Sequence, residues 1–424
     1  MNDASTDMAS PELERRLVER LLWRGVPAEQ GAALRSDAAR ADWACLMYEA
    51  GPALHPMLAH ACERHAVSLS HEVKATLAGV RRSASMVALR RRAVLREAMA
   101  RLDNANISVV VLKGMALAYQ VYPAPELRVM NDLDLWIDGA SLARAAEVLR
   151  PFAATAHWRH DTMEAQCSAG VIKLDVGDPP LLIELHASPA SLAATVPLEV
   201  AGMWQRRLPV SLGDVSCTVL APEDQLLHLA VHLAHHHAFI GGLPRLLDVA
   251  LLLEREGTTL DWDALAARSR PHGAAGWVAA TLAAAALSFG ASVPSHAFNV
   301  LGVPDTQSLA RIARDQAWGG ARPALNALSV MSAPTLVEQL RSVTIRVRDI
   351  AWDSGAPQAG LRPPADVWRR LRLAGTLYAP ALVRGLVGRL RGEVDMDSLR
   401  RLRRANEELA TLMTRAGDDA RRDF

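Results

Sequence analysis

The hydrophobic pattern of the chain has a helical period toward both ends and a strand period in the middle. From Ser10 to about Asn104, and again beyond Ala221, apolar residues recur at three- and four-residue spacing. Between these stretches, residues 107–112 are a continuous β-branched and leucine run, typical of a strand buried on both faces. The pattern predicts three parts: an N-terminal helical region (1–105), an α/β core (106–220) and a C-terminal helical region (221–424).

Within the core, the pattern predicts strand, helix, strand, helix and then a hairpin. The strands are expected at 107–112, 126–138, 170–177 and 180–188, and the helices at 113–122 and 139–150. The turn signal Gly-Asp-Pro-Pro separates the last two strands. A small sheet with two helices is therefore expected between the helical regions.

A long arginine-rich helix is expected immediately before the core, from Glu72 to Leu102. We interpret its arginines as a solvated face, with a surface for phosphates or an acidic partner as the alternative. Its apolar positions are expected to turn inward: Val87, Leu89, Val94, Leu95 and Met99.

Composition and charge exclude several classes of protein. The formal net charge of +1 gives no global field that would favour nucleic acid or an anionic membrane as a partner. Four widely spaced cysteines without a CxxC pair argue against a zinc site or a disulfide framework. The longest apolar run, residues 273–291, is mostly alanine and glycine and predicts a buried helix rather than a membrane span. Because no signal-peptide pattern opens the chain, we expect a cytoplasmic protein.

Two aspartates stand one residue apart in the apolar segment "NDLDLWID". In a strand, side chains at i and i+2 point to the same face, so Asp132 and Asp134 are expected to point the same way. Two like charges held this close are unfavourable unless a cation lies near them. The segment therefore predicts a cation-binding position.

A third carboxylate is expected on a neighbouring strand. Glu184 lies within the apolar segment "LLIELHAS", and His186 follows on the same face. Three carboxylates on neighbouring strands form a set of oxygen ligands suited to Mg²⁺, which also binds water and substrate phosphates. Asp175 is a rival for the third position, but it adjoins a turn, where Asp is commonly structural. Glu184 is therefore the preferred candidate.

A candidate phosphate-binding turn precedes the aspartates. Lys113 and Gly114 stand at a predicted strand-to-helix junction, where glycine permits close approach and the helix offers free N–H groups to an anion. Arg128, just before the aspartate strand, carries a fork suited to phosphate. Together with a carboxylate–metal site, this turn indicates phosphoryl or nucleotidyl transfer.

The segment "ISVVVLKGMALAYQVYPAPELRVMNDLDLWID", followed by "IELHAS", resembles the bacterial nucleotidyltransferase-like family. That family is a branch of the DNA polymerase β-type nucleotidyltransferase superfamily, whose pattern is a glycine-containing turn, an Asp-x-Asp strand and a later acidic residue. The helical segment "PEDQLLHLAVHLAHHH" also resembles this branch. The resemblance implies an α+β fold: a minimal polymerase β-like core with a mixed sheet, flanked by helical regions.

The resemblance further implies an Mg²⁺- or Mn²⁺-dependent enzyme that transfers a nucleoside monophosphate from an NTP, with ATP expected as donor, and releases pyrophosphate. Its acceptor would be a small molecule, peptide or protein rather than nucleic acid, and no membrane partner is expected. Asp132, Asp134 and Glu184 would be the catalytic and metal-binding residues. The nucleotide would be bound by Lys113, Gly114, Arg128 and His186.

One departure from the family pattern leaves alternatives open. The superfamily turn is Gly-Ser, whereas this chain has Lys113-Gly114. The chain could therefore be a non-catalytic nucleotide-binding or protein-interaction module, and the aspartates could pair with Lys113 or Arg128 in a structural role.

A histidine-rich helix follows the predicted core. Three open interpretations are packing, a wall of the active site, or a transition-metal site, although no acidic residue interleaves as in HExxH. Its histidines are His228, His232, His235, His236 and His237.

Overall fold

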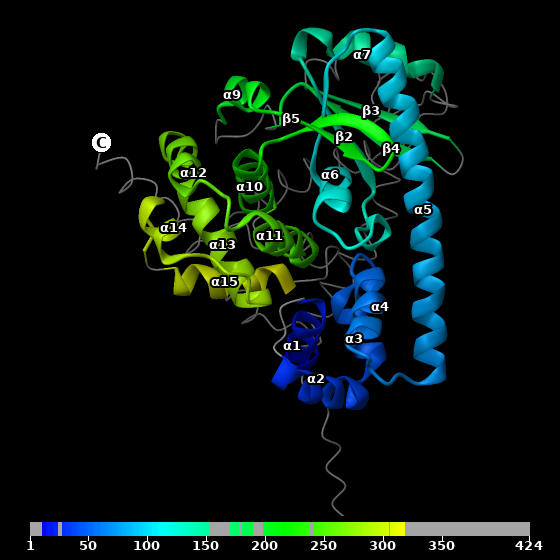
Figure 1. Cartoon of the computed structure of the whole chain (residues 1–424), viewed down its shortest axis with the longest axis vertical. Coiled ribbons are helices and arrows are strands. Elements are labelled where there is room, and N and C mark those ends of the chain that lie inside the picture. Colours follow the sequence, from blue (N-terminus) through cyan, green and yellow to red (C-terminus); the bar gives the residue numbers. More distant parts are fainter. Residues whose placement is uncertain are drawn as a thin grey trace, which may run out of the picture.

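The computed structural model describes residues 11–23, 28–152, 170–177, 180–189, 198–237, 239, 241–304 and 306–318. Residues 319–424, within the predicted C-terminal helical region, lie outside the described residues. Figure 1 shows a sheet in one part of the molecule, with helices on both sides of it. The fold is α+β, as the sequence predicts.

The described part of the chain contains a mixed sheet of six strands, in the order β3-β4-β2-β1-β6-β5. β2 pairs with β4 in parallel, β1 pairs with β6 in parallel, and the other three pairings are antiparallel. The mixed sheet is thus confirmed. The strands are β1 (Val109–Val111), β2 (Asp132–Ile137), β3 (Val171–Val176), β4 (Leu181–His186), β5 (Leu208–Leu212) and β6 (Val215–Val219).

The β5–β6 hairpin was not expected from the sequence. Leu212 pairs with Val215, so Gly213 and Asp214 form a two-residue turn with glycine, at φ 65°, in its first position. Alternating apolar and polar residues in "VSLGDVSCTV" are the signal that could have revealed it. The hairpin extends the sheet beyond β1, through the pairing of Val110 with Thr218.

Helices precede, interrupt and follow the sheet. Before it come α1 (Pro11–Leu22), α2 (Ala28–Arg40), α3 (Trp43–Ala50), α4 (His55–Arg64) and α5 (His71–Asn104). Between strands lie α6 (Lys113–Gln120), the short 3-10 helix η1 (Pro125–Leu127), α7 (Leu142–Leu149) and α9 (Val200–Gln205). After it come α10 (Pro222–Ala230), the π-helix η4 (Val231–His236), α11 (Leu243–Glu256), α12 (Trp262–Ser269), α13 (Ala275–Phe289), α14 (Ser295–Val300) and α15 (Gln307–Trp318).

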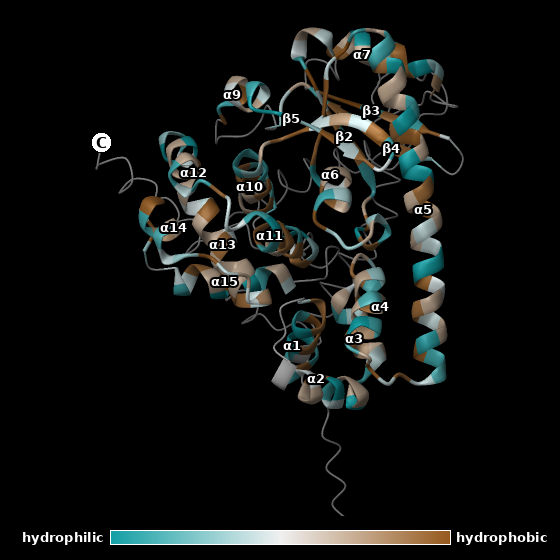
Figure 2. Ribbon diagram, viewed as in Figure 1, coloured by the Kyte–Doolittle hydropathy of each residue, from teal (hydrophilic) through white to brown (hydrophobic). Residues whose placement is uncertain are grey.

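The two faces of the sheet have different chemistry. Leu133, Leu135 and Ile137 of β2 belong to a buried cluster with residues of α5 and α7. Because side chains alternate along a strand, Asp132, Asp134 and Trp136 point to the opposite face. Apolar residues of the strands appear brown in Figure 2. Both aspartates therefore lie on the face away from α5 and α7.

The long helix α5 is only partly buried on its apolar side. Val94 and Leu95 are buried against the sheet, and Met99 is partly buried there. Val87 and Leu89 are 41% and 59% exposed, so the expectation that they turn inward was wrong. The physical reason is the length of α5, which spans from the N-terminal helices to the sheet (Figure 1). Both residues lie near the middle of this 34-residue helix, on a side that stays exposed to water.

The apolar run at residues 273–291 forms α13, a helix of 15 residues buried among other helices. Within the described ranges, none of the helices combines the length and the apolarity needed to cross a bilayer.

Candidate functional site

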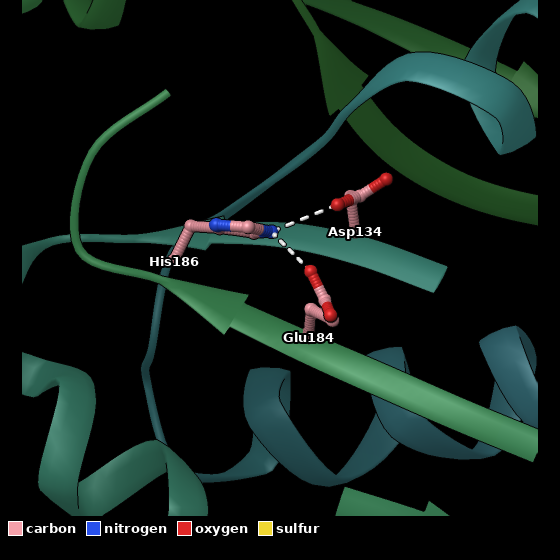
Figure 3. Close-up of side chains that lie close together, drawn as sticks. All are labelled: Asp134, Glu184 and His186. Atoms are coloured by element: carbon pink, nitrogen blue, oxygen red, sulfur yellow. Dashed lines mark hydrogen bonds and ion pairs between the residues drawn. The ribbon is translucent and has the colours of Figure 1, made fainter. Parts of the chain in front are cut away.

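The parallel pairing of β2 with β4 brings the predicted acidic residues together. In this register Asp134 lies opposite Glu184, and Trp136 lies opposite His186. Side chains at paired positions share a face, so Asp134, Glu184 and His186 converge on one side of the sheet (Figure 3). The sequence predicted which side chains share a face within each strand, and the register between the strands places these side chains next to one another.

One side-chain oxygen of each carboxylate and one ring nitrogen of His186 all lie within 4.8 Å of one another. His186 Nε2 is 2.8 Å from Asp134 Oδ1 and 3.5 Å from Glu184 Oε2 (Figure 3). Asp134 is 3% exposed, so its carboxylate is withdrawn from bulk water. Two carboxylates and an imidazole at this spacing could hold a divalent metal ion.

Asp132 lies beside this group rather than within it. It is the first residue of β2 and is partly buried. Burial and the neighbouring charges of Asp134 and Glu184 raise the pKa of Asp132, while the Lys113 ammonium opposes that rise. The three predicted carboxylates are thus close enough to influence one another, but His186 takes the place of Asp132 in the tightest group.

Lys113 reaches this group from the strand-to-helix junction. It is the first residue of α6, and its Nζ donates a hydrogen bond of 2.8 Å to Asp134 Oδ1. The backbone N–H of Leu112 donates to the carbonyl of Asp134 at 3.0 Å, which ties the junction to β2. Burial alone would raise the pKa of Asp134, but Lys113 and His186 outweigh it and hold that pKa well below its usual range.

Gly114 packs closely against the segment that leads into β2. A Cβ atom at this position would lie 3.3 Å from both Cβ and Sδ of Met130. Any larger residue would push Met130 away, so glycine lets the start of α6 sit against the sheet.

Arg128 has a different neighbour from the one expected of a phosphate ligand. Its Nε and Nη2 donate to the two carboxylate oxygens of Asp248 on α11, each at 2.7 Å, and the Tyr122 hydroxyl donates to Asp248 Oδ1 at 2.7 Å. Burial alone would lower the pKa of Arg128, but the Asp248 carboxylate outweighs this effect and raises the pKa above its usual value. The guanidinium fork is therefore engaged with Asp248, and its role toward nucleotide stays a prediction. Asp248, an acid within the apolar segment "LLDVALLL", was the sequence signal for this partnership.

Lys173 is a member of the site that sequence reasoning missed. It lies opposite Glu184 in the β3–β4 pairing, and its Nζ is 3.0 Å from Glu184 Oε1. The chain contains three lysines, Lys74, Lys113 and Lys173, among 47 lysines and arginines, and two of the three pair with carboxylates here. The rarity of lysine in the chain was the sequence feature that could have pointed to Lys173. The rival acid Asp175 lies opposite Leu182 and is not part of the group that could hold a metal within the described residues.

The histidine-rich segment continues from α10 directly into the π-helix η4. The ring of His232 lies 6.2 Å from that of His228 and 4.7 Å from that of His237, measured between centroids. Burial and the charge of Lys113, followed by His228, His237 and Arg245, lower the pKa of His232 well below its usual value. The charge of Lys113 thus acts on His232, and the interpretation of the segment as a wall of the site stays a prediction. The side chains of His235 and His236 lie outside the described residues.

A family model described as an uncharacterised nucleotidyltransferase matches residues 39–290, which include every residue of the site and more than half of the chain. No curated protein and no solved structure gives a significant match.

Proposed function

The chain belongs to the uncharacterised nucleotidyltransferase family, and we propose that it transfers a nucleoside monophosphate from an NTP, with ATP as donor, to a non-nucleic-acid acceptor. The observation that carries this proposal is the β2–β4 register, which sets Asp134 opposite Glu184 on the face that Lys113 reaches. A buried acidic group next to a cationic turn suits a metal–triphosphate complex.

The donor atoms fit a divalent ion. Asp134, Glu184 and His186 would hold it, with Asp132 as a further ligand at the start of β2. Mg²⁺ accepts carboxylate oxygens, and Mn²⁺ accepts both these oxygens and an imidazole nitrogen. When bound, the ion would neutralise charge on the triphosphate and on the departing pyrophosphate.

The residues of the site would bind the phosphates and orient the α-phosphorus. The first turn of α6 offers backbone N–H groups, and Lys113 adds a positive charge at the same end of the helix. Arg128 would act indirectly, because its pairing with Asp248 fixes the segment that leads into β2. We assign it a positioning role.

The reaction would be an in-line displacement at the α-phosphorus. An acceptor hydroxyl forms a new P–O bond, the bond between the α-phosphorus and the bridging oxygen breaks, and pyrophosphate leaves with both electrons of that bond. The hydroxyl proton passes to a carboxylate of the site, for which we propose Glu184, with Asp132 as the second candidate.

The acceptor would approach from the side of the helical regions. The wall formed by α10 and η4, with His232 near Lys113, is the described surface that we assign to acceptor selection. A small molecule, a peptide and a protein are all compatible acceptors.

The proposal is tested with Mg²⁺ or Mn²⁺ and a cell extract as acceptor source. Pyrophosphate release is followed from γ-labelled ATP, and the acceptor is labelled in a parallel reaction with α-labelled ATP. Replacing Asp134→Asn or Glu184→Gln should lower release by at least about 100-fold, because each removes a charge on which the metal depends. Asp214→Asn, a change at an exposed hairpin turn, is the matched control and should leave release unchanged.

Equal release by wild type and Asp134→Asn would contradict the proposal. Nucleotide binding without any release, under every acceptor condition, would instead favour the non-catalytic nucleotide-binding module. Mass spectrometry of the labelled product would identify the acceptor.

A further inference from the structure

The Lys113 ammonium shares a carboxylate oxygen with the group that could hold a metal. Asp134 Oδ1 accepts from Lys113 Nζ and lies against His186 Nε2, each at 2.8 Å. The same His186 nitrogen lies 3.5 Å from Glu184 Oε2. A divalent ion held by these residues would compete with the ammonium for Asp134 Oδ1, because two cations at one oxygen repel each other.

The backbone conformation at Lys113 is unfavourable for a residue with a side chain. Lys113 has φ 47°, in the left-handed region that glycine adopts most readily. A residue with a side chain is disfavoured there unless the side chain compensates. Lysine thus occupies a position where the backbone conformation would favour glycine, which indicates that the lysine side chain contributes an interaction.

The choice of lysine also differs from the rest of the chain, which uses arginine for nearly all of its positive charges. The Arg128–Asp248 pair shows the permanent form of a buried ion pair: two parallel hydrogen bonds of 2.7 Å from a rigid fork. Lys113 makes one hydrogen bond from a flexible stem. A single contact of this kind can be exchanged without dismantling a bidentate geometry.

We propose that Lys113 is an exchangeable counter-ion, which pairs with Asp134 until a divalent ion takes that carboxylate and then binds the phosphates of the nucleotide. The inference presupposes the metal and nucleotide site proposed above. Three carboxylates, Asp132, Asp134 and Glu184, face two ammonium groups, Lys113 and Lys173. A divalent ion alone would leave the Lys113 ammonium, 18% exposed, without its partner.

Phosphate groups resolve that conflict. Bound at the first turn of α6, where Lys113 is the first residue, their oxygens would give the displaced ammonium a new partner. The divalent ion and the nucleotide therefore favour each other's binding, and Lys113 carries the coupling.

The test is Mn²⁺ binding by the full chain, measured by electron paramagnetic resonance, with the ion alone and as its complex with α,β-methylene-ATP. For wild type the complex should bind at least about tenfold more tightly than the ion alone. In Lys113→Met the ion alone should bind at least about tenfold more tightly than it does to wild type, and the advantage of the complex should shrink by a similar factor.

Two further variants keep the result interpretable. Lys113→Gly removes the same ammonium and suits the left-handed backbone, so it should reproduce Lys113→Met even if methionine perturbs folding. Lys173→Met removes a positive charge from Glu184 but leaves the Lys113–Asp134 pair, so the ratio between the two affinities should stay near that of wild type.

Unchanged affinity for Mn²⁺ alone in both Lys113 variants would overturn the counter-ion role. The same conclusion would follow if Lys173→Met changed the ratio as much as Lys113→Met, because the effect would then be general electrostatics. Failure of the proposed function is distinguishable: wild type and Asp134→Asn would then bind the complex equally or not at all.

Discussion

His232 illustrates how a single residue of the site depends on its charged neighbours. Its imidazole lies between the rings of His228 and His237 along the segment and is influenced by the cations Lys113 and Arg245. Burial and these basic groups all disfavour a second positive charge, so the ring is neutral in the folded protein near pH 7.

This neutrality should make the stability of the protein depend on pH. The pKa of His232 is lower in the folded than in the unfolded state, where it is about 6.5. Below that pH, His232 binds a proton in the unfolded chain but stays neutral in the folded chain, so the free energy of unfolding falls as the pH falls. Between pH 6.5 and 5.5, wild type should lose about 1 kcal/mol more than His232→Gln.

Urea unfolding of both proteins at the two pH values measures this difference. His296→Gln, a change at an exposed histidine, is the control and should behave as wild type does. An identical pH dependence in wild type and His232→Gln would show that His232 is not held neutral by its surroundings.

At the scale of secondary-structure elements, the sequence predicted which face of a strand a side chain occupies better than it predicted which residues pair with one another. The alternation around Asp132 and Asp134 gave the correct face, because the period of a strand is local. The parallel register of Asp134 with Glu184 joins strands about 50 residues apart and is set by packing of the whole sheet. Asp248 was missed for the same reason, since its partner Arg128 lies 120 residues away. The β5–β6 hairpin and the Lys173–Glu184 pair are closer in sequence, and their local signals were overlooked.

The Arg128–Asp248 pair links two such elements, the segment before β2 and helix α11. Asp248→Ala should lower the free energy of unfolding by about 3–5 kcal/mol, because it leaves the Arg128 guanidinium buried without its anion. The double variant Arg128→Met/Asp248→Leu should recover much of that loss, since no buried charge remains.

Chemical unfolding of wild type, the single variant and the double variant measures both effects. Arg96→Ala breaks an exposed pair with Asp214 and should change stability by less than about 1 kcal/mol. Both variants lose the Tyr122–Asp248 hydrogen bond, so the comparison isolates the unpaired Arg128 charge. A double variant no more stable than Asp248→Ala would contradict the explanation by an unpaired buried charge.

At the scale of the whole molecule, one buried cluster contains residues from all three of the predicted parts, 1–105, 106–220 and 221–424. Leu58 of α4, Val110 of β1 and Leu246 of α11 belong to it. A second link joins the first and last described helices: Arg314 of α15 donates twice to Glu19 of α1, each bond 2.8 Å long. Such connections favour cooperative folding of the described part of the chain over independent folding of three domains.

Leu58→Ala tests whether the described part of the chain unfolds as one unit. Leu58 is fully buried, so its truncation should lower the free energy of unfolding by about 2–5 kcal/mol. Because the cluster is shared, thermal unfolding followed by circular dichroism and loss of Mn²⁺–nucleotide binding should shift together. Leu13→Ala, at a 63% exposed position of α1, should shift neither transition. If only the circular dichroism transition moved, the N-terminal helices would be a separate folding unit, and the site would depend on the sheet and the later helices alone.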